Sequence, residues 1–575
     1  MLKTLFSNIG EYKKKALLAP AAIVGEVAME VTIPMVMAKI LDNGISKGRI
    51  GYVAAMGGVM MLMALFSLMF GALAGRLSAV AAMGFAKNLR SALFRKVQSF
   101  SFSNVDKFST ASLTTRLTTD VTNVQNAFMM LIRGAVRSPI MLVMATIMAV
   151  RMNARLSLVF FAAVPVLGIA LFLIIFNAHP RFENMLRRYD DMNGKVQENL
   201  VGIRVVKAFA REEHEKKLFR ENTDRVRRAQ FFAEKLVILS MPIMQLCMYA
   251  SIAAIMWFGG HMAVDGDILT GELSSFIMYV SQILMALMML SLLFIMFVIS
   301  RASVERICEV LEEEPSISDE GSRNVSAADG SISFRNVSFS YFNDMKNLAL
   351  DHIDLEIRSG ETIGMIGGTG SSKSTLVQLI PRLYDTTQGE VLVGGINVRE
   401  YPLDTLRGQV AMVLQKNELF SGTIKDNLRW GNEAATDEEI EEACRAACAH
   451  DFIMGFPEGY NTYLGQGGVN VSGGQKQRLC IARALLKKPK IIILDDSTSA
   501  VDTATDSSIR RAFREKLSDT TTIIIAQRIS SVMDADRIVV MDNGKISGIG
   551  THEELLAGNE IYREVYESQQ KGADE

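Results

Sequence analysis

The chain has 575 residues, of which 49% are hydrophobic and 21% are charged, and its formal net charge at pH 7 is −1. Two unlike halves explain this composition better than one uniform domain, and the near-zero net charge argues against a nucleic-acid-binding protein. The five cysteines form no CxxC pair and no disulfide framework, which indicates a reducing cytosol around the soluble half.

The N-terminal half predicts a short helix at the membrane surface, followed by six membrane spans. Residues 1–15 are basic and mildly amphipathic, which is typical of an interfacial helix. Apolar runs long enough to cross a bilayer, about 20 residues each, all fall before Arg301. They lie at 16–41, 52–76, 129–150, 156–178, 235–263 and 273–299.

The distribution of Lys and Arg predicts how these spans are oriented. Basic residues are abundant between spans two and three and between spans four and five. The loops at 42–51, 151–155 and 264–272 contain only four such residues in total. The positive-inside rule then places both termini in the cytoplasm. We expect a multi-pass integral protein of the cell (plasma or inner) membrane, surrounded by lipid.

The two long internal segments are predicted to extend the spans as helices. Each has helical periodicity on both sides of a short break, near Ser103–Thr110 and near Lys207–His214, and we expect short helices there that contact the soluble domain. A polar helix runs to Glu312, and a linker rich in Ser, Gly and acidic residues follows. The expected divisions are a transmembrane domain at 1–312, the linker at 313–330, a soluble domain at 331–568 and a tail at 569–575.

Ionisable residues inside the predicted spans are functional candidates by default. Glu26 and Glu30 are one helical turn apart on one face of the first span. They are candidates either for a substrate cavity that takes a cationic or amphipathic solute or for a structural pairing. Arg133 and Arg137 repeat this spacing near the cytoplasmic end of the third span, where their side chains can extend toward water.

The C-terminal half carries the pattern of a nucleotide-binding loop. The apolar run TIGMI leads into the glycine-rich GGTGSSKST at a strand-to-helix turn, which is the context of a Walker A loop. The backbone of such a loop wraps phosphates, while Lys373 reaches the β- and γ-phosphates and Ser374 ligates Mg²⁺. The loop residues are Gly367, Gly368, Thr369, Gly370, Ser371, Ser372, Lys373, Ser374 and Thr375.

A second pattern, at 470–502, predicts a loop, a helix and a strand. Four residues precede the helix, so their N–H groups lie at a helix N-terminus that suits phosphate. The run 491–494 is continuously apolar, as expected for a buried parallel strand, and it delivers Asp495 and Asp496 to the carboxyl end of the sheet. The four residues before the helix are Ser472, Gly473, Gly474 and Gln475.

These patterns resemble the ABC-transporter family over nearly the full length. VSGGQ is similar to the family's signature motif, ILDD to its Walker B and SAVD to its D-loop. SNVDKFSTASLTTRLTTD and ENLVGIRVVKAFAREEHE resemble its two coupling-helix regions. The resemblance implies an all-α six-helix transmembrane domain of the exporter type, followed by an α/β P-loop NTPase domain with a helical subdomain. It also implies ATP and Mg²⁺ as cofactors.

The resemblance assigns roles to further residues. Tyr341 matches the A-loop aromatic that stacks on the base. Gln415 matches the Q-loop residue, which would hold Mg²⁺ together with Ser374 and Asp495. In this family each ATP lies between the Walker motifs of one half and the signature of the other. The signature residues 472–475 and the D-loop Asp502 would therefore act in trans.

Three positions that face the nucleotide depart from the family pattern. Ser372 replaces the glycine before the lysine, and serine costs about 1 kcal/mol there if the position requires a positive φ. Asp496 stands in place of the catalytic glutamate and is one methylene shorter, so it should not reach the attacking water well. Gln527 stands in place of the switch histidine and cannot carry a proton in that role.

Together these departures resemble the degenerate half of a heterodimeric exporter. We expect an ATP-driven half-transporter that moves hydrophobic or amphipathic solutes (drug, lipid or peptide) out of the cytoplasm. Its own Walker site would hydrolyse ATP poorly, and it would pair with a second, non-identical half. The alternatives are a homodimeric exporter in which Asp496 hydrolyses ATP slowly, and an ATP-binding membrane sensor that does not transport.

Overall fold

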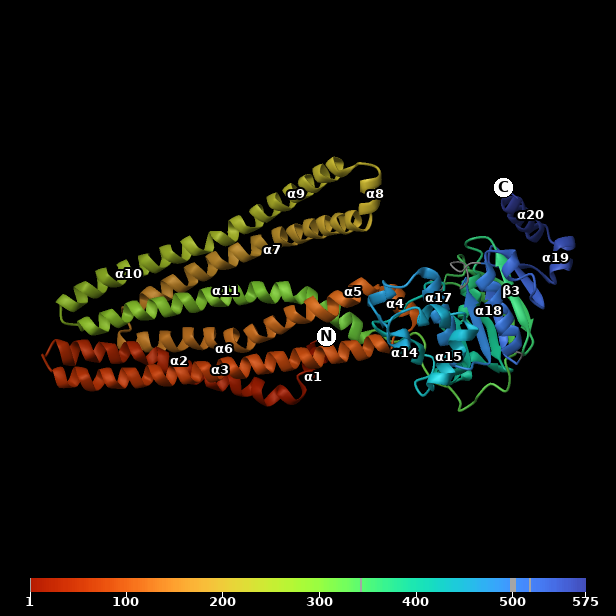
Figure 1. Cartoon of the computed structure of the whole chain (residues 1–575). Coiled ribbons are helices and arrows are strands. Elements are labelled where there is room, and N and C mark those ends of the chain that lie inside the picture. Colours follow the sequence, from red (N-terminus) through yellow and green to blue (C-terminus); the bar gives the residue numbers. More distant parts are fainter. Residues whose placement is uncertain (1, 342–343, 497–502, 517–518, 575) are drawn as a thin grey trace. The chain divides into compact units, whose positions relative to one another are not determined.

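The computed structural model describes residues 2–341, 344–496, 503–516 and 519–574. The chain forms two compact units (Figure 1). We call Met1–Gln98 with Ser109–Glu313 the helical unit, and Ser99–Phe108 with Glu314–Glu575 the sheet unit. The short segment 99–108 therefore packs with the sheet unit, although both of its flanking helices belong to the helical unit.

The helical unit contains the predicted membrane spans. Within the described residues, six segments are long and apolar enough to cross a membrane, as predicted. The fifth predicted span begins inside α9 (Glu212–Ile238), which only Leu239 separates from the next helix. The main helices of the six segments are α2 (Lys13–Lys39), α3 (Ile50–Gln98), α6 (Val121–Met152), α7 (Leu158–Val201), α10 (Ser240–Val264) and α11 (Thr270–Glu312).

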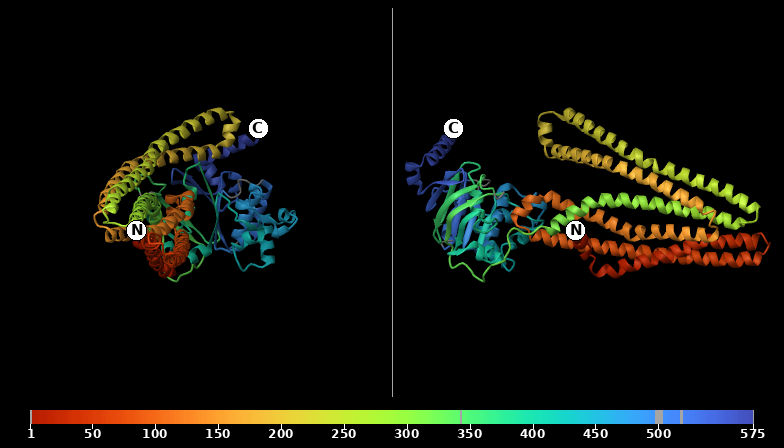
Figure 2. Two further views of the ribbon diagram at one scale, coloured as in Figure 1. Left: turned by 90° about the vertical axis from the view of Figure 1, so that its left-hand side faces the viewer. Right: turned by 180° about the vertical axis from the view of Figure 1, so that it is seen from behind.

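Several of these helices are far longer than a bilayer requires. A helix of about 20 residues crosses the hydrocarbon core, whereas α3 has 49 residues, α7 has 44 and α11 has 43. Helix α9 runs alongside α7, and the short helix α8 (Ile203–Ala208) joins the two (Figures 1 and 2). The spans thus continue as helices beyond their apolar parts, as predicted, although α8 begins before the predicted break.

Charged contacts hold the polar end of α11 within the helical unit. Arg306 donates to both carboxylate oxygens of Asp120 at 2.5 and 2.8 Å, and Arg116 pairs with Glu309 at 2.8 Å. The polar helix predicted up to Glu312 is therefore the last part of α11. The remaining elements of this unit are α1 (Leu2–Ser7), a 3-10 turn (Gly10–Tyr12), α5 (Thr110–Thr115) and two π-helical segments (Ile40–Ile45 and Arg116–Asp120).

The sheet unit is built on a six-stranded sheet with the order β12-β11-β3-β10-β9-β6. All neighbours pair in parallel except β12, which is antiparallel at the edge. Every residue of β9 and β10 is buried, as expected for apolar strands covered on both faces. The strands are β3 (Thr362–Gly367), β6 (Val410–Val413), β9 (Ile491–Asp495), β10 (Thr521–Ile525), β11 (Arg537–Asp542) and β12 (Lys545–Gly550).

Two smaller sheets and a set of helices complete the sheet unit. An antiparallel sheet has the order β2-β1-β4-β5, and its strands are β1 (Ile332–Phe339), β2 (Leu350–Ile357), β4 (Gln388–Val393) and β5 (Ile396–Asn397). A two-stranded sheet pairs β7 (Gly422–Thr423) with β8 (Tyr463–Leu464). The helices are α4 (Phe102–Phe108), α12 (Lys373–Gln378), α13 (Leu403–Gln409), α14 (Ile424–Arg429), α15 (Asp437–Ala446), α16 (His450–Met454), α17 (Gly473–Leu486), α18 (Thr503–Lys516), α19 (His552–Gly558) and α20 (Glu560–Asp574).

Helices α14 to α17 give the α/β unit its helical subdomain. They pack around a shared apolar core that includes Leu428, Cys444, Ile453 and Leu479. This agrees with the predicted fold class, in which six apolar helices precede an α/β domain with a helical subdomain.

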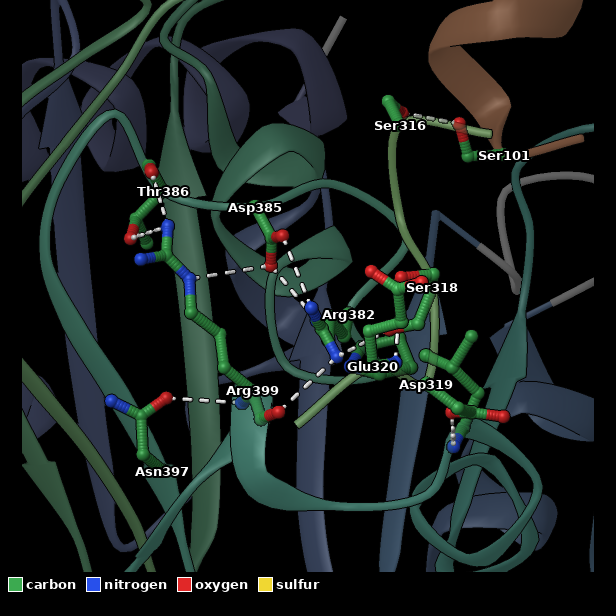
Figure 3. Close-up of polar contacts among 12 residues, drawn as sticks. Ser101, Ser316, Ser318, Asp319, Glu320, Arg382, Asp385, Thr386, Asn397 and Arg399 are labelled. Carbon is green, nitrogen blue, oxygen red and sulfur yellow. Dashed lines mark hydrogen bonds and ion pairs between the residues drawn. The ribbon is translucent and has the colours of Figure 1, made fainter. Parts of the chain in front are cut away.

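The predicted linker, residues 313–330, contains no helix or strand, but it is bound along the sheet unit. Asp319 Oδ1 accepts the Leu403 backbone N–H at 2.8 Å, and the Ser318 carbonyl accepts a hydrogen bond from Arg382 at 3.5 Å (Figure 3). Arg382 is only 6% exposed. The linker therefore supplies an acceptor to a buried guanidinium rather than running free over the surface.

Candidate nucleotide site

The glycine-rich loop lies between β3 and α12, as the sequence predicted. Two residues of the loop have positive φ, Gly370 at 84° and Ser372 at 69°. The Lys373 ammonium donates to the carbonyls of Gly367 and Gly368, each at 2.9 Å, and burial lowers the pKa of Lys373. The loop thus folds around the Lys373 ammonium, the group that the sequence assigned to the phosphates.

Ser372 has the positive φ at which a serine is strained. Its φ of 69° and ψ of 24° lie in the left-handed region, just before α12 begins. A residue with a Cβ costs about 1–2 kcal/mol in this conformation. The serine is therefore strained at the position where the family pattern has glycine.

Ser374 and Asp495 come together at the carboxyl end of the sheet. The Ser374 hydroxyl donates to Asp495 Oδ1 at 2.9 Å, and burial raises the pKa of Asp495, which is 3% exposed. Hydroxyl, carboxylate and amide oxygens are ligands that suit Mg²⁺, so Ser374, Asp495 and Gln415 fit the ion by their chemistry. Bound Mg²⁺ would offset the negative charge of the phosphates.

Asp496 is held by two glutamines through one carboxylate oxygen. Gln527 Nε2 donates to Asp496 Oδ2 at 2.7 Å, and Gln415 Nε2 lies 3.5 Å from the same atom. Asp496 and Gln527 lie close together because the parallel strands β9 and β10 end side by side. Burial raises the pKa of Asp496, while both amide donors oppose that rise. The two departures at 496 and 527 therefore form one hydrogen-bonded pair.

Gln477 also holds Asp496, although the sequence analysis did not single it out. Its Nε2 donates to the Asp496 backbone carbonyl at 3.3 Å, and Asp496 has a positive φ of 48°. Gln477 lies on α17, four positions before Ile481 in the helix core. Gln477 is a polar residue among the apolar buried residues of α17, and this pattern could have indicated that its side chain has a specific partner.

The signature residues begin helix α17. The Ser472 hydroxyl accepts the Gln475 N–H at 3.3 Å, and the Gln475 side chain accepts the Ser472 N–H at 2.8 Å, so the two form a capping box. Ser472 and Gly473 are exposed. The predicted D-loop residue Asp502 lies outside the described residues.

Tyr341 lies beside the glycine-rich loop. Its hydroxyl is 2.9 Å from the Thr375 hydroxyl, and the residue is 44% exposed. Tyr341 therefore has free aromatic surface next to the loop on which a base can stack.

The two glutamates of the first span face an arginine of the third. Arg137 donates to Glu30 Oε2 at 2.6 Å and lies 3.7 Å from Glu26 Oε1. Glu26 is buried, and a Cβ at Gly71 of α3 would lie 3.2 Å from its carboxylate. Arg137 thus pairs with glutamates across α2 and α6. Ionisable residues inside a membrane span commonly pair with one another.

Comparisons with known proteins place the chain in one family. Residues 17–301 match the ABC transporter transmembrane region, and residues 350–499 match the ABC transporter domain. A Bacillus subtilis relative described as the uncharacterized ABC transporter ATP-binding protein YfiB is 39% identical over 568 residues, which cover 99% of this chain and 98% of the relative. The chain belongs to the ABC transporter family.

Two other relatives have names that describe transport. YgaD of Bacillus subtilis, a putative multidrug export ATP-binding/permease protein, is 34% identical over 492 residues and covers 83% of each chain. The ATP-dependent lipid A-core flippase of Chromohalobacter salexigens is 35% identical over 475 residues, covering 82% of this chain and 81% of the relative.

A solved structure has the same fold. It is a bacterial Atm1-family ABC exporter with ATP bound, with a TM-score of 0.84, 24% identity and coverage of 97% of this chain and 98% of that one. The chain is therefore an integral membrane protein with an exporter-type transmembrane domain, and its sheet unit is an ABC ATPase domain that binds ATP with Mg²⁺.

Proposed function

We propose that this chain is one half of a heterodimeric exporter, and that its own Walker site binds ATP but hydrolyses it slowly. The observation that carries this proposal is the hydrogen bond from Gln527 to Asp496. A general base must offer a free lone pair to the attacking water at the correct distance. Here the Asp496 carboxylate accepts hydrogen bonds from the side-chain amides of Gln527 and Gln415. Gln527 stands where the family pattern has a histidine.

The surfaces of the chain support a partner half. Ser472 and Gly473 at the start of α17 are exposed, and the N–H groups of a helix's first turn have no partner within the helix. Around α8, Val205 and Phe209 are 60% and 75% exposed. Apolar side chains at a helix turn far from the long apolar segments are better explained by a partner surface than by lipid.

The proposed substrate is a hydrophobic or amphipathic solute, including drugs and lipids. The relatives named for multidrug export and for lipid A-core flipping support this class. Helices α6 and α11 also line an apolar cavity of about 200 Å³, whose walls include Met130, Pro139, Leu293 and Phe294. Such a surface binds apolar groups without requiring a particular shape.

The charge of one side-chain cluster supports a preference of the transporter for positively charged amphipathic substrates. The cluster consists of Glu26, Glu30 and Arg137. Two carboxylates face one guanidinium, so the cluster carries one excess negative charge when all three groups are ionised. Within the described part of the chain, Glu26 Oε2 and Gln282 Oε1 are buried without a hydrogen-bond partner. A cationic headgroup would satisfy these acceptors and neutralise the excess charge.

The pairing can be tested by purification from the native membrane. We expect the chain to co-purify with a non-identical ABC half that carries a glutamate after its Walker B aspartate. We also expect ATPase activity in this complex to exceed that of the isolated chain. Equal turnover by the homomer would favour the homodimeric exporter. ATP binding without movement of any solute in either form would favour the sensor.

The charge preference can be tested in proteoliposomes that contain the complex. Substrate-stimulated ATPase is measured with lipophilic cations and with neutral amphipaths of similar size. We expect Glu26→Gln with Glu30→Gln to lose stimulation by the cations and keep stimulation by the neutral compounds. Glu183→Gln, at an exposed position on α7, is the matched control. Equal loss for both compound classes would contradict a role in charge recognition.

A further inference from the structure

Helix α4 contacts Tyr384 of the sheet unit through two of its residues. The Tyr384 hydroxyl donates to Asp106 Oδ2 at 2.7 Å, and its ring stacks on Phe102 with centroids 6.0 Å apart and planes 25° apart. Phe102 and Asp106 are both on α4. Burial raises the pKa of Tyr384 and the bond to Asp106 raises it further, so the phenol remains a donor at physiological pH.

The same ring contacts the tyrosine that is expected to stack on the base. Tyr384 and Tyr341 meet edge to face, with centroids 5.3 Å apart and planes 87° apart. Phe339 touches both rings, at 4.9 Å from Tyr341 and 5.6 Å from Tyr384. Tyr341 is also hydrogen-bonded to Thr375 of the phosphate loop. One hydrogen bond and two aromatic contacts therefore connect that loop to Phe102 of α4.

A second attachment of α4 does not involve the nucleotide site. The Ser101 hydroxyl lies 2.5 Å from the Ser316 hydroxyl of the linker (Figure 3), and Ser103 lies 2.5 Å from the same group. Asn104 accepts the Ser316 N–H at 3.1 Å and donates to the Glu314 carbonyl at 3.0 Å. These contacts hold the start of α4 to the linker, whereas the contacts of Tyr384 join α4 to the ring of Tyr341.

We propose that Tyr384 is a positioning residue that transmits stacking of a purine base on Tyr341 to α4. The inference rests on the proposed nucleotide site, in which Tyr341 binds the base. A base stacked on the exposed face of Tyr341 fixes that ring against the edge of Tyr384. Tyr384 in turn holds Phe102 by stacking and Asp106 by a charge-assisted hydrogen bond. Packed aromatic contacts shift as a unit and do not deform gradually.

The test compares two ligands on the purified full-length transporter by hydrogen–deuterium exchange. Mg·ATP carries a base, whereas Mg·tripolyphosphate supplies only the phosphates. We expect ATP, but not tripolyphosphate, to slow exchange in the segment 99–108 by about tenfold, roughly the effect of one hydrogen bond to a charged group. Equal protection by both ligands would overturn the proposal, because the signal would then come from the phosphates.

Variants separate the aromatic path from simple packing. Tyr384→Phe keeps the ring and removes the hydroxyl, so we expect the ATP response of α4 to weaken severalfold, and Tyr384→Leu should abolish it. Tyr401→Phe is the matched control, because Tyr401 likewise donates its hydroxyl within the same unit, to the Val393 carbonyl at 2.6 Å. A normal ATP response in Tyr384→Leu would overturn the proposal.

Equilibrium ATP binding, measured on the same samples, distinguishes this inference from the nucleotide site on which it rests. Unchanged affinity in Tyr384→Phe together with a weakened exchange response supports transmission. A loss of affinity that accounts for the weakened response would assign Tyr384 to the binding site and overturn transmission. Failure of the unmodified protein to bind ATP would contradict the nucleotide site itself.

Discussion

Restoring the two divergent residues, by Asp496→Glu together with Gln527→His, should raise hydrolysis at this chain's own Walker site. The longer carboxylate can reach the attacking water, and a positioned general base contributes about 10²–10⁴-fold, or roughly 2.7–5.4 kcal/mol of the barrier. We expect the lower part of this range, because Gln415 remains 3.5 Å from the carboxylate at this position and opposes proton uptake.

The single variants show how the gain is divided. In Asp496→Glu alone, Gln527 remains available to donate to the new carboxylate. A hydrogen bond to a charged group is worth about 1.5–3 kcal/mol, so this variant should be roughly 10-fold to 100-fold slower than the double variant. Gln527→His alone should gain little, since the short carboxylate remains at 496.

The measurement is single-turnover hydrolysis of ATP by the complex, with the catalytic glutamate of the partner half replaced by glutamine. Only this chain's Walker site then contributes to the rate. The complex that retains Asp496 and Gln527 in this chain sets the baseline rate. ATP binding is checked in each variant. If the double variant binds ATP normally and remains at the baseline, the pair at 496 and 527 does not limit this site. The argument from base geometry would then be refuted.

Ser372→Gly should tighten nucleotide binding by up to about thirtyfold without raising turnover, because glycine relieves a left-handed strain of about 1–2 kcal/mol. Equilibrium binding of ATP tests this, and unchanged affinity would show that the loop accommodates serine. Ser472→Ala should reduce the ATPase rate of the complex by about 10²–10³-fold, whereas Lys373→Ala should reduce it only partly. A larger loss for Lys373→Ala would mean that Ser472 serves only as the cap of α17. Burial raises the pKa of Cys444 to about 12, so its thiolate is scarce at pH 8. It should react with a maleimide about 10³-fold more slowly than an exposed thiol, and labelling at the exposed rate would contradict the burial.

Local patterns were enough to predict the main elements of both units. The spans could be located because apolar runs of bilayer length are distinctive, and the buried strands because continuous apolar runs alternate with glycine-rich turns. The second break begins earlier than predicted, at Gly202, where α7 ends and α8 begins. The acidic residues at the start of α9 were the clearer signal for the end of the break.

The contacts that could not be predicted join residues far apart in the chain. Arg137 and Glu30 are 107 positions apart, and Tyr384 and Asp106 are 278 apart. Neither contact alters the hydrophobic periodicity of its own segment. Hydropathy and residue spacing therefore could not predict these two contacts. The family pattern located Asp496 and Gln527 by number, but only the register of β9 and β10 shows that the second donates to the first.

The bound linker has a consequence for anyone who isolates the ATPase domain as a soluble fragment. A fragment that begins at the first strand, near Ser331, would omit Ser318 and Asp319. It would remove one acceptor from the buried Arg382 guanidinium and expose the backbone N–H of Leu403 at the start of α13. A fragment that begins at Glu314 would retain both contacts. The practical N-terminal boundary of the domain thus lies before its first strand, in a segment that has no regular secondary structure.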